Sequence, residues 1–308
     1  MMPRPKGCKV VATEIGLHGE VLRLFVRDDS ADGVLARISH PGFASFPETR
    51  TEREYSALLS VCTFNATYEI PLSNLTTTFP KLQVFPNGDP LVVASRCRRF
   101  NDDTYELNAT VHDTEGGVLR QFLLGDGIEH VQIDRDGNIW VGYFDEGVYG
   151  NFGWGHPNGP VGAAGLTCFN DRGEKLWGFQ PPRGFDAISD CYALNVAKDG
   201  AWAYYYTGFP FVRIDSEWNV RAWRTNTSGG REFAVHGKHI LHYGGYGEHK
   251  TDCKLLRLDQ ETTQLVSQVA LLLPTDVDLS RSVVIGRDNK LHVLFDDSWY
   301  VFSVESII

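Results

Sequence analysis

Short turns of the Asp-Gly type recur along the chain, and they constrain the fold more than any other feature of the sequence. They occur at Asp32-Gly33, Asn87-Gly88, Asp136-Gly137, Asp199-Gly200, His236-Gly237 and Asp288-Asn289. Each lies between two apolar runs of strand length, and these residue types tolerate the positive φ that a two-residue hairpin turn requires. The repeating unit is such a hairpin followed by a loop and a second hairpin. The six turns therefore predict an all-β, six-bladed β-propeller with four antiparallel strands in each blade.

The stretch from Ile128 to Trp177 shows this unit most clearly. Two apolar runs flank Asp136-Gly137, and two more flank Asp171-Arg172-Gly173. A long glycine-rich loop separates the two hairpins. This pattern is typical of one complete propeller blade.

The segment Asp134-Arg135-Asp136-Gly137-Asn138-Ile139-Trp140-Val141-Gly142 resembles the repeat of two-component-regulator-type propellers. It resembles the gluconolactonase-like and virginiamycin-lyase-like propellers more loosely. Eroded versions of the repeat occur around Asp199-Gly200 and Asp288-Asn289. The resemblance implies a propeller fold over most of the chain and transfers no function, because such repeats serve many unrelated ones.

The two ends of the chain suggest how the ring closes. Three predicted strands follow Ser282, whereas the N-terminal run Lys9–Ile15 has no evident partner in the first blade. We assign the first blade the strand pair Val21–Val26 and Val34–Ile38, followed by a second hairpin. The N-terminal run is then expected to join the C-terminal blade and close a single domain of residues 1–308. An open or seven-bladed arrangement is the alternative.

Composition narrows the class of protein. Aliphatic and aromatic residues make up 42% of 308 residues, which is ample for a large core. The formal net charge of −10 argues against nucleic-acid binding, which needs a cationic face. The N-terminus lacks a signal-peptide pattern and no apolar run is long enough for a membrane helix, so we expect a cytoplasmic protein without a membrane partner. The six scattered cysteines form no CxxC pair and are expected to be reduced core or loop thiols.

A candidate site follows from the predicted architecture. The loop leading into a blade's first strand and the loop between its second and third strands open on the same face of a propeller. The candidate ligand-binding residues on this face are Glu129, His130, Asp145, Glu146, Tyr149, Trp154, His156, Asp190, Arg231, Glu232, Tyr246 and His249. Trp154 and His156 are expected to project from their glycine-rich loop, although its aromatic side chains could equally fold back and cap the propeller.

Two kinds of chemistry are open to such a face. Glu129, Asp190 and Glu232 could converge as oxygen ligands for a divalent cation, Ca²⁺ or Mg²⁺, or they could instead bond neighbouring amides and arginines. The resemblance to lactonase-like propellers, which hold a metal in the channel, makes the first arrangement a hypothesis, although the ligands of that family cannot be matched here residue by residue. His130, His156 and His249 are the candidates for a catalytic general base.

The sequence thus leaves two hypotheses for function. The first is a non-catalytic propeller that presents its loop-rich face to a protein or a small polar ligand. The second is a metal-dependent hydrolase or lyase that uses the carboxylates and a histidine base. The chain carries no nucleophile elbow, which disfavours covalent hydrolase chemistry.

Overall fold

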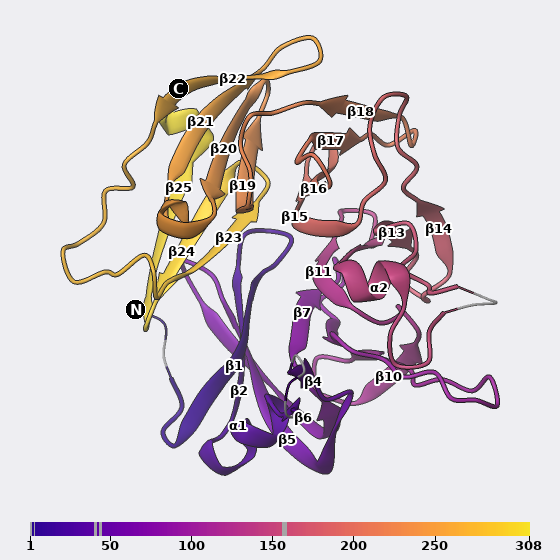
Figure 1. Cartoon of the computed structure of the whole chain (residues 1–308). Helices are drawn as coiled ribbons and strands as arrows, with labels where there is room; N and C mark the ends of the chain where they lie inside the picture. Colours follow the sequence, from indigo (N-terminus) through magenta and orange to yellow (C-terminus); the bar gives the residue numbers. More distant parts are fainter. Residues whose placement is uncertain (1, 3, 40–41, 43–44, 156–158) are drawn as a thin grey trace. The chain divides into compact units, whose positions relative to one another are not determined.

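The chain is an all-β, six-bladed β-propeller, described by a computed structural model over residues 2, 4–39, 42, 45–155 and 159–308 (Figure 1). It divides into two compact units, which we describe separately. Unit 2 holds residues 4–163 and 167–176, and unit 1 holds Met2, residues 164–166 and residues 177–308. Within the described residues, none of the helices is long and apolar enough to cross a membrane.

Unit 2 contains the first three blades, and the third runs slightly beyond it. The first sheet has the order β1-β2-β5-β6, the second β10-β9-β8-β7 and the third β11-β12-β13-β14. The strands are β1 (Cys8–Ile15), β2 (Val21–Arg27), β5 (Arg50–Cys62), β6 (Thr67–Thr77), β7 (Pro80–Val84), β8 (Pro90–Ala94), β9 (Ala109–His112), β10 (Val118–Phe122), β11 (Ile128–Ile133), β12 (Ile139–Tyr143), β13 (Leu166–Phe169) and β14 (Lys175–Gly178). Two short helices, α1 (Asp28–Val34) and α2 (Asp145–Tyr149), and a small hairpin, β3 (Arg37–Ile38) with β4 (Phe46–Pro47), decorate these blades.

Unit 1 contains the last three blades. Its sheets have the orders β15-β16-β17-β18, β19-β20-β21-β22 and β23-β24-β25. The strands are β15 (Asp190–Ala197), β16 (Gly200–Tyr206), β17 (Phe211–Ile214), β18 (Val220–Trp223), β19 (Gly230–His236), β20 (His239–Gly244), β21 (Cys253–Leu258), β22 (Thr263–Gln268), β23 (Val283–Arg287), β24 (Lys290–Phe295) and β25 (Ser298–Ser303). The 3₁₀ turns η1 (Gly247–His249) and η2 (Val304–Ser306) complete it.

Five of the six predicted turns join the first two strands of a blade. Gly88, Gly137 and Gly200 have φ of 95°, 84° and 134°, and Asp288 has φ of 51°. Gly237 is likewise left-handed at 57°. These values confirm the prediction that the turns need residues that tolerate positive φ. Few residue types do so, and the turns therefore identify the repeat in the sequence.

The predicted closure of the ring by the N-terminal strand is wrong. β1 pairs with β2 along its length, from Cys8 opposite Arg27 to Ile15 opposite Val21. The sixth sheet has three strands among the described residues, β23, β24 and β25. The local hairpin needs only a short turn, in which Gly16 donates to the carbonyl of Glu20, so its closure costs far less chain entropy than pairing across the whole sequence.

The prediction for the first blade fails for the same reason. Asp32-Gly33 lies inside helix α1 and is not a hairpin turn, and Val34 ends that helix. β1 occupies one edge of β2 and β5 occupies the other, so no edge of β2 is left for the segment after it. The strand that follows in the sheet is β5, which pairs with β2 from Val21 opposite Cys62 to Val26 opposite Ala57.

The core lies between blades within each unit. In unit 2 the strands β2, β8 and β12 are buried almost throughout, because blades pack on both of their faces. In unit 1 Phe211, Phe233 and Leu256 belong to one such cluster. All six cysteines are free thiols and five are buried, which confirms their prediction as core or loop thiols.

Candidate functional site

The clearest candidate site in unit 2 is a cavity of 560 Å³ beside the first strands of its three blades. We call it the Glu129 cavity. Its wall combines charged side chains of both signs with aromatic rings, and the residues that matter for the argument are Glu14, Lys81, Arg96, Glu129 and Glu146, with Phe46, Phe79 and Phe144. Glu129 and Glu146 were candidates from sequence, so the structure brings two predicted residues together.

Glu129 reaches this cavity through an irregularity in β11. Ile128 pairs with Tyr143 and His130 pairs with Gly142, so Glu129 is an extra residue in the ladder, a β-bulge. A bulge re-aims the side chain it carries and is common beside functional sites. Val11 on β1 is placed in the same way between Val10 and Ala12 and also lines the cavity.

Glu14 is the site residue that the sequence analysis missed. It lies on β1, and with β1 assigned to the last blade it could not be placed beside Glu129. Burial raises the pKa of Glu14 to about 7, an effect that the charge of Glu129 adds to and that of Lys81 opposes. A carboxyl group that is about half protonated at neutral pH can both donate and accept a hydrogen bond, which marks a functional-site candidate.

Arg96 forms a fixed part of the wall. Its guanidinium is buried and donates two hydrogen bonds of 2.9 Å to the Asp126 carboxylate, which also accepts from the amide of Cys97. Burial raises the pKa of Asp126, while the Arg96 guanidinium lowers it. Arg96 also pairs with Glu146, a side chain that accepts a bond from Asn151. Glu146 is thus held at the cavity from two directions.

The loop after β12 has its two predicted arrangements at different residues. Asp145 and Tyr149 on α2 are exposed, and Tyr149 is 68% accessible. Trp154 was expected to project from the loop, but it is only 7% accessible and its indole N–H donates to the carbonyl of Cys97 at 2.7 Å. The reason is that the indole packs beside Tyr105 and under the guanidinium of Arg99. The predicted His156 lies outside the described residues.

The remaining predicted residues belong to unit 1, apart from His130, which is half-buried on β11. The Tyr246 hydroxyl bonds the hydroxyl of Tyr192 at 2.6 Å, and burial together with this bond raises the pKa of Tyr192. Asp190 raises that pKa further and Arg231 lowers it, so these side chains share one neighbourhood. Tyr192 and Arg231 are both bulge residues, on β15 and β19.

Glu232 and His249 have structural partners. The Glu232 carboxylate accepts a 2.8 Å hydrogen bond from the amide of Gly286 on the neighbouring β23, as the alternative to a metal ligand anticipated. His249 bonds Asp252 through Nδ1 at 2.9 Å.

The predicted metal ligands fall in different units, Glu129 in unit 2 and the other two in unit 1. In the part of the chain that the structure describes, no group of three or more His, Cys, Asp or Glu side chains is arranged to hold a metal ion. In unit 2 the charge of Glu129 acts on the carboxyl group of Glu14.

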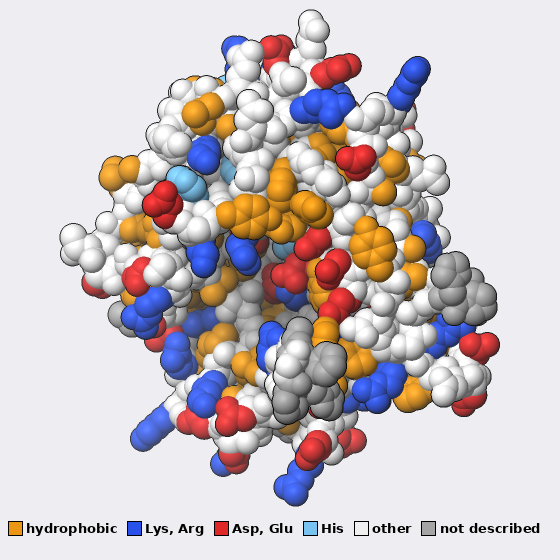
Figure 2. Space-filling model, in the orientation of Figure 1, with side chains coloured by type: hydrophobic (Ala, Val, Ile, Leu, Met, Phe, Trp, Pro, Cys, Tyr) orange, Lys and Arg blue, Asp and Glu red, His pale blue; other side chains and the backbone are white. Residues whose placement is uncertain are grey.

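The charge of the surface is mixed. On the face shown in Figure 2, basic and acidic side chains are interspersed, so the net charge of −10 does not produce a single acidic surface there.

Residues 168–301 match the model of the YxzG family, which is less than half of the chain. No curated protein matches the sequence.

Solved β-propellers match along nearly the whole chain at low identity. Virginiamycin B lyase from Staphylococcus aureus is 11% identical, with 98% of this chain and 96% of that chain covered and a TM-score of 0.46. A gluconolactonase from Xanthomonas campestris is 13% identical, with coverages of 98% and 99% and a TM-score of 0.44. A β-propeller domain of a protease from Pyrococcus furiosus is 14% identical, with coverages of 96% and 83% and a TM-score of 0.47.

Proposed function

We propose that this chain is a ligand-binding β-propeller that takes a small polar molecule into the Glu129 cavity without transforming it. The supporting observation is the composition of that cavity, where Glu14, Glu129 and Glu146 stand with Lys81 and Arg96 among aromatic rings. A volume of 560 Å³ falls within the usual range of small-molecule pockets. Small-molecule pockets usually orient their ligand with a few convergent polar groups beside an apolar surface.

The charges favour a ligand that carries a cationic group. Arg96 is already satisfied by Asp126 and Glu146, whereas the pKa of Glu14 stays raised by burial and by the charge of Glu129, although Lys81 lowers it. A positive group between Glu14 and Glu129 would add to the effect of Lys81 and favour the ionised form of Glu14. Binding should therefore tighten as pH rises through about 7, because less work is then needed to remove the Glu14 proton.

Calorimetric titration of the full chain with a panel of amino acids and linear amines tests this function. We expect Glu129→Gln to weaken binding of the best ligand by roughly tenfold or more, the loss of one charge-assisted hydrogen bond. Asp145→Asn is the matched control, because Asp145 is exposed on α2 and does not line the cavity. Equal affinities for wild type and Glu129→Gln would refute the assignment.

The like-charged neighbours Glu14 and Glu129 favour one alternative, a hydrolase or lyase that depends on a divalent cation. A carboxylate that raises the pKa of a neighbouring carboxyl group, as Glu129 does for Glu14, is an arrangement that Ca²⁺ or Mg²⁺ would stabilise. Thermal melting in Ca²⁺ and in Mg²⁺ discriminates the two functions. Stabilisation that is lost in Glu14→Gln would support the metal-dependent alternative, whereas unchanged melting with amine binding intact would support simple binding.

A further inference from the structure

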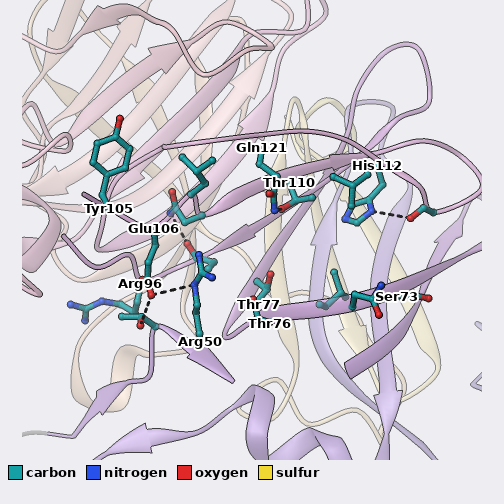
Figure 3. Close-up of a pocket in the computed structure, with 18 of the residues that line it drawn as sticks. Arg50, Ser73, Thr76, Thr77, Arg96, Tyr105, Glu106, Thr110, His112 and Gln121 are labelled. Carbon is teal, nitrogen blue, oxygen red and sulfur yellow. Dashed lines mark hydrogen bonds and ion pairs between the residues drawn. The ribbon is translucent and has the colours of Figure 1, made fainter. Parts of the chain in front are cut away.

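A second cavity in unit 2 has a different chemistry from the first. It has a volume of 470 Å³ and lies between the outer strand of the first blade and the outer strands of the second (Figure 3). Ser73, Thr76 and Thr77 from β6 lie along one side, and Thr110 and Gln121 from β9 and β10 lie along the other. We call it the hydroxyl-lined cavity.

The charged groups of this cavity are all paired, and Arg96, which lines it as well as the Glu129 cavity, is held by Asp126 and Glu146. Arg50 pairs with Glu106 at 3.2 Å, and the same carboxylate accepts from the amide of Arg98 at 2.7 Å. His112 is fully buried at the other end, where its Nδ1 bonds the carbonyl of Gly116, and burial lowers its pKa so that the ring is neutral at pH 7. The cavity therefore offers hydroxyl and amide groups with no net charge.

The backbone of β6 is shaped to present these groups. Leu75 pairs with Tyr55 and Leu72 pairs with Ala57, so Ser73 and Asn74 form a bulge that adds one residue to β6. Asn74 has a φ of 57°, a conformation that asparagine adopts more readily than most residues. Such bulges turn side chains away from the regular ladder, and here both bulge residues line the cavity.

The walls are held rigidly from behind. The side-chain nitrogen of Asn108, Nδ2, donates to the carbonyls of Ala94 and Gly125, and its side-chain oxygen, Oδ1, accepts from the backbone amide of Leu124. The turn between β9 and β10 also packs closely against β6. The approach is so close that a side chain at Gly116 would collide with the carbonyl of Pro71. Fixed walls reduce the entropy that a ligand must pay to order them.

One aromatic residue, Tyr105, lies at the Glu106 end of the cavity (Figure 3). Tyr105 lines the cavity, is 48% accessible, and is braced by Trp154 at a ring distance of 6.1 Å. A tyrosine ring offers a flat apolar surface together with a polar hydroxyl. An uncharged ligand that has many hydroxyl groups and one apolar face of C–H bonds would match both the walls and this ring.

From these observations we propose that the hydroxyl-lined cavity is a binding site for a neutral saccharide of one or two sugar units. Thr110 and Gln121, joined by a 3.0 Å hydrogen bond, would bond hydroxyl groups on one side and Ser73 on the other. Tyr105 would lie against the sugar ring. The two cavities share Arg96 in their walls, but neither proposal depends on the other.

Titration of the full chain with glucose and maltose, followed by ligand-observed NMR and calorimetry, tests the proposal. We expect at least one of these sugars to bind in the millimolar range or tighter, and glucose 6-phosphate to bind no better than glucose. Absence of binding by both sugars, or tighter binding of the phosphate, would overturn it.

Variants locate the site. Thr110→Val removes the hydroxyl and keeps the shape of the side chain, and we expect it to weaken sugar binding by about fivefold to tenfold. Tyr105→Ala should weaken it at least as much. Thr263→Val, on β22 of unit 1, is the matched control and should bind like wild type. Wild-type affinity in both cavity variants would show that the sugar binds elsewhere and would overturn the proposal.

Discussion

Arg96 in unit 2 and His242 in unit 1 are buried polar side chains with opposite surroundings, although both units are built from the same repeat. Unit 2 buries Arg96 against Asp126, a charged pair with two hydrogen bonds. Unit 1 buries His242 among Tyr204 and Phe211, and neither ring nitrogen has a hydrogen-bond partner within the described residues. Burial lowers the pKa of His242 to about 3, and the charge of Lys254 lowers it further. Removing one partner of the ion pair should therefore lower the free energy of unfolding, whereas acid should lower it through protonation of the imidazole.

The largest effect is expected from breaking the ion pair of unit 2. Arg96→Met leaves the Asp126 carboxylate buried without its guanidinium, and we expect a loss of about 3–5 kcal/mol in the free energy of unfolding. Urea denaturation at pH 7 measures it. Arg120→Met is the control, because Arg120 and Asp171 form a partly exposed pair that contributes no more than about 1 kcal/mol. Equal losses in the two variants would contradict the distinction between buried and exposed pairs.

Trp154 sharpens the comparison within unit 2. Its buried indole N–H is satisfied by Cys97, so Trp154→Ala should remove about 3 kcal/mol of stability through the cavity and the lost bond. Tyr149→Ala, on the exposed side of the same loop, should change stability by no more than about 0.5 kcal/mol. Thermal melts of both variants test this, and a melt of Trp154→Ala like that of wild type would mean that the loop does not cap the unit.

Acid should affect unit 1 through its buried histidines. The folded pKa of His242 lies below that of the unfolded chain, so the stability it permits is complete above about pH 6.5 and is lost as pH falls toward 3. We expect His242→Leu to reduce the loss of stability between pH 7 and pH 5 by about 2 kcal/mol. His292 remains in this variant, and burial also lowers its pKa to about 3, so part of the pH dependence of stability should persist.

The control for this pH dependence is His18→Leu, which removes an exposed histidine and leaves the buried histidines in place. Denaturation curves at several pH values provide the measurement. A slope in His242→Leu that matches wild type would show that this imidazole is not the group that acid titrates.

Glu14 should produce the smallest effect, and with the opposite sign. Its folded pKa of about 7 lies above the unfolded value, so the folded chain holds the extra proton and stability falls as pH rises from about 4.5 to 7. Glu14→Gln should remove that fall in stability. We expect the fall to be about 1 kcal/mol, because the side chain keeps some contact with water, which screens its charge. An unchanged pH profile would remove Glu14 as a titrating group of the cavity.

The candidate site was only half predictable. Glu129 and Glu146 could be found from the loops that they occupy, and Glu14 could not, because its strand was assigned to the wrong blade. Whether Trp154 projects or folds back could not be decided from the sequence, since glycine-rich loops give no signal of whether a ring turns inward. The hydroxyl-lined cavity left no motif, because its residues come from separate strands with ordinary strand composition.

The sequence by itself determined the repeat, the five hairpin turns that set it and the all-β class, because positive φ and the alternation of apolar runs are properties of a few neighbouring residues. Only the tertiary structure decided the partner of β1 and the direction in which Glu129 points. Strand partners compete across the whole chain, and a bulge shifts the ladder by one residue without any mark in the local pattern. The site depends on both of these, so its outline could be predicted from the sequence while its chemistry required the fold.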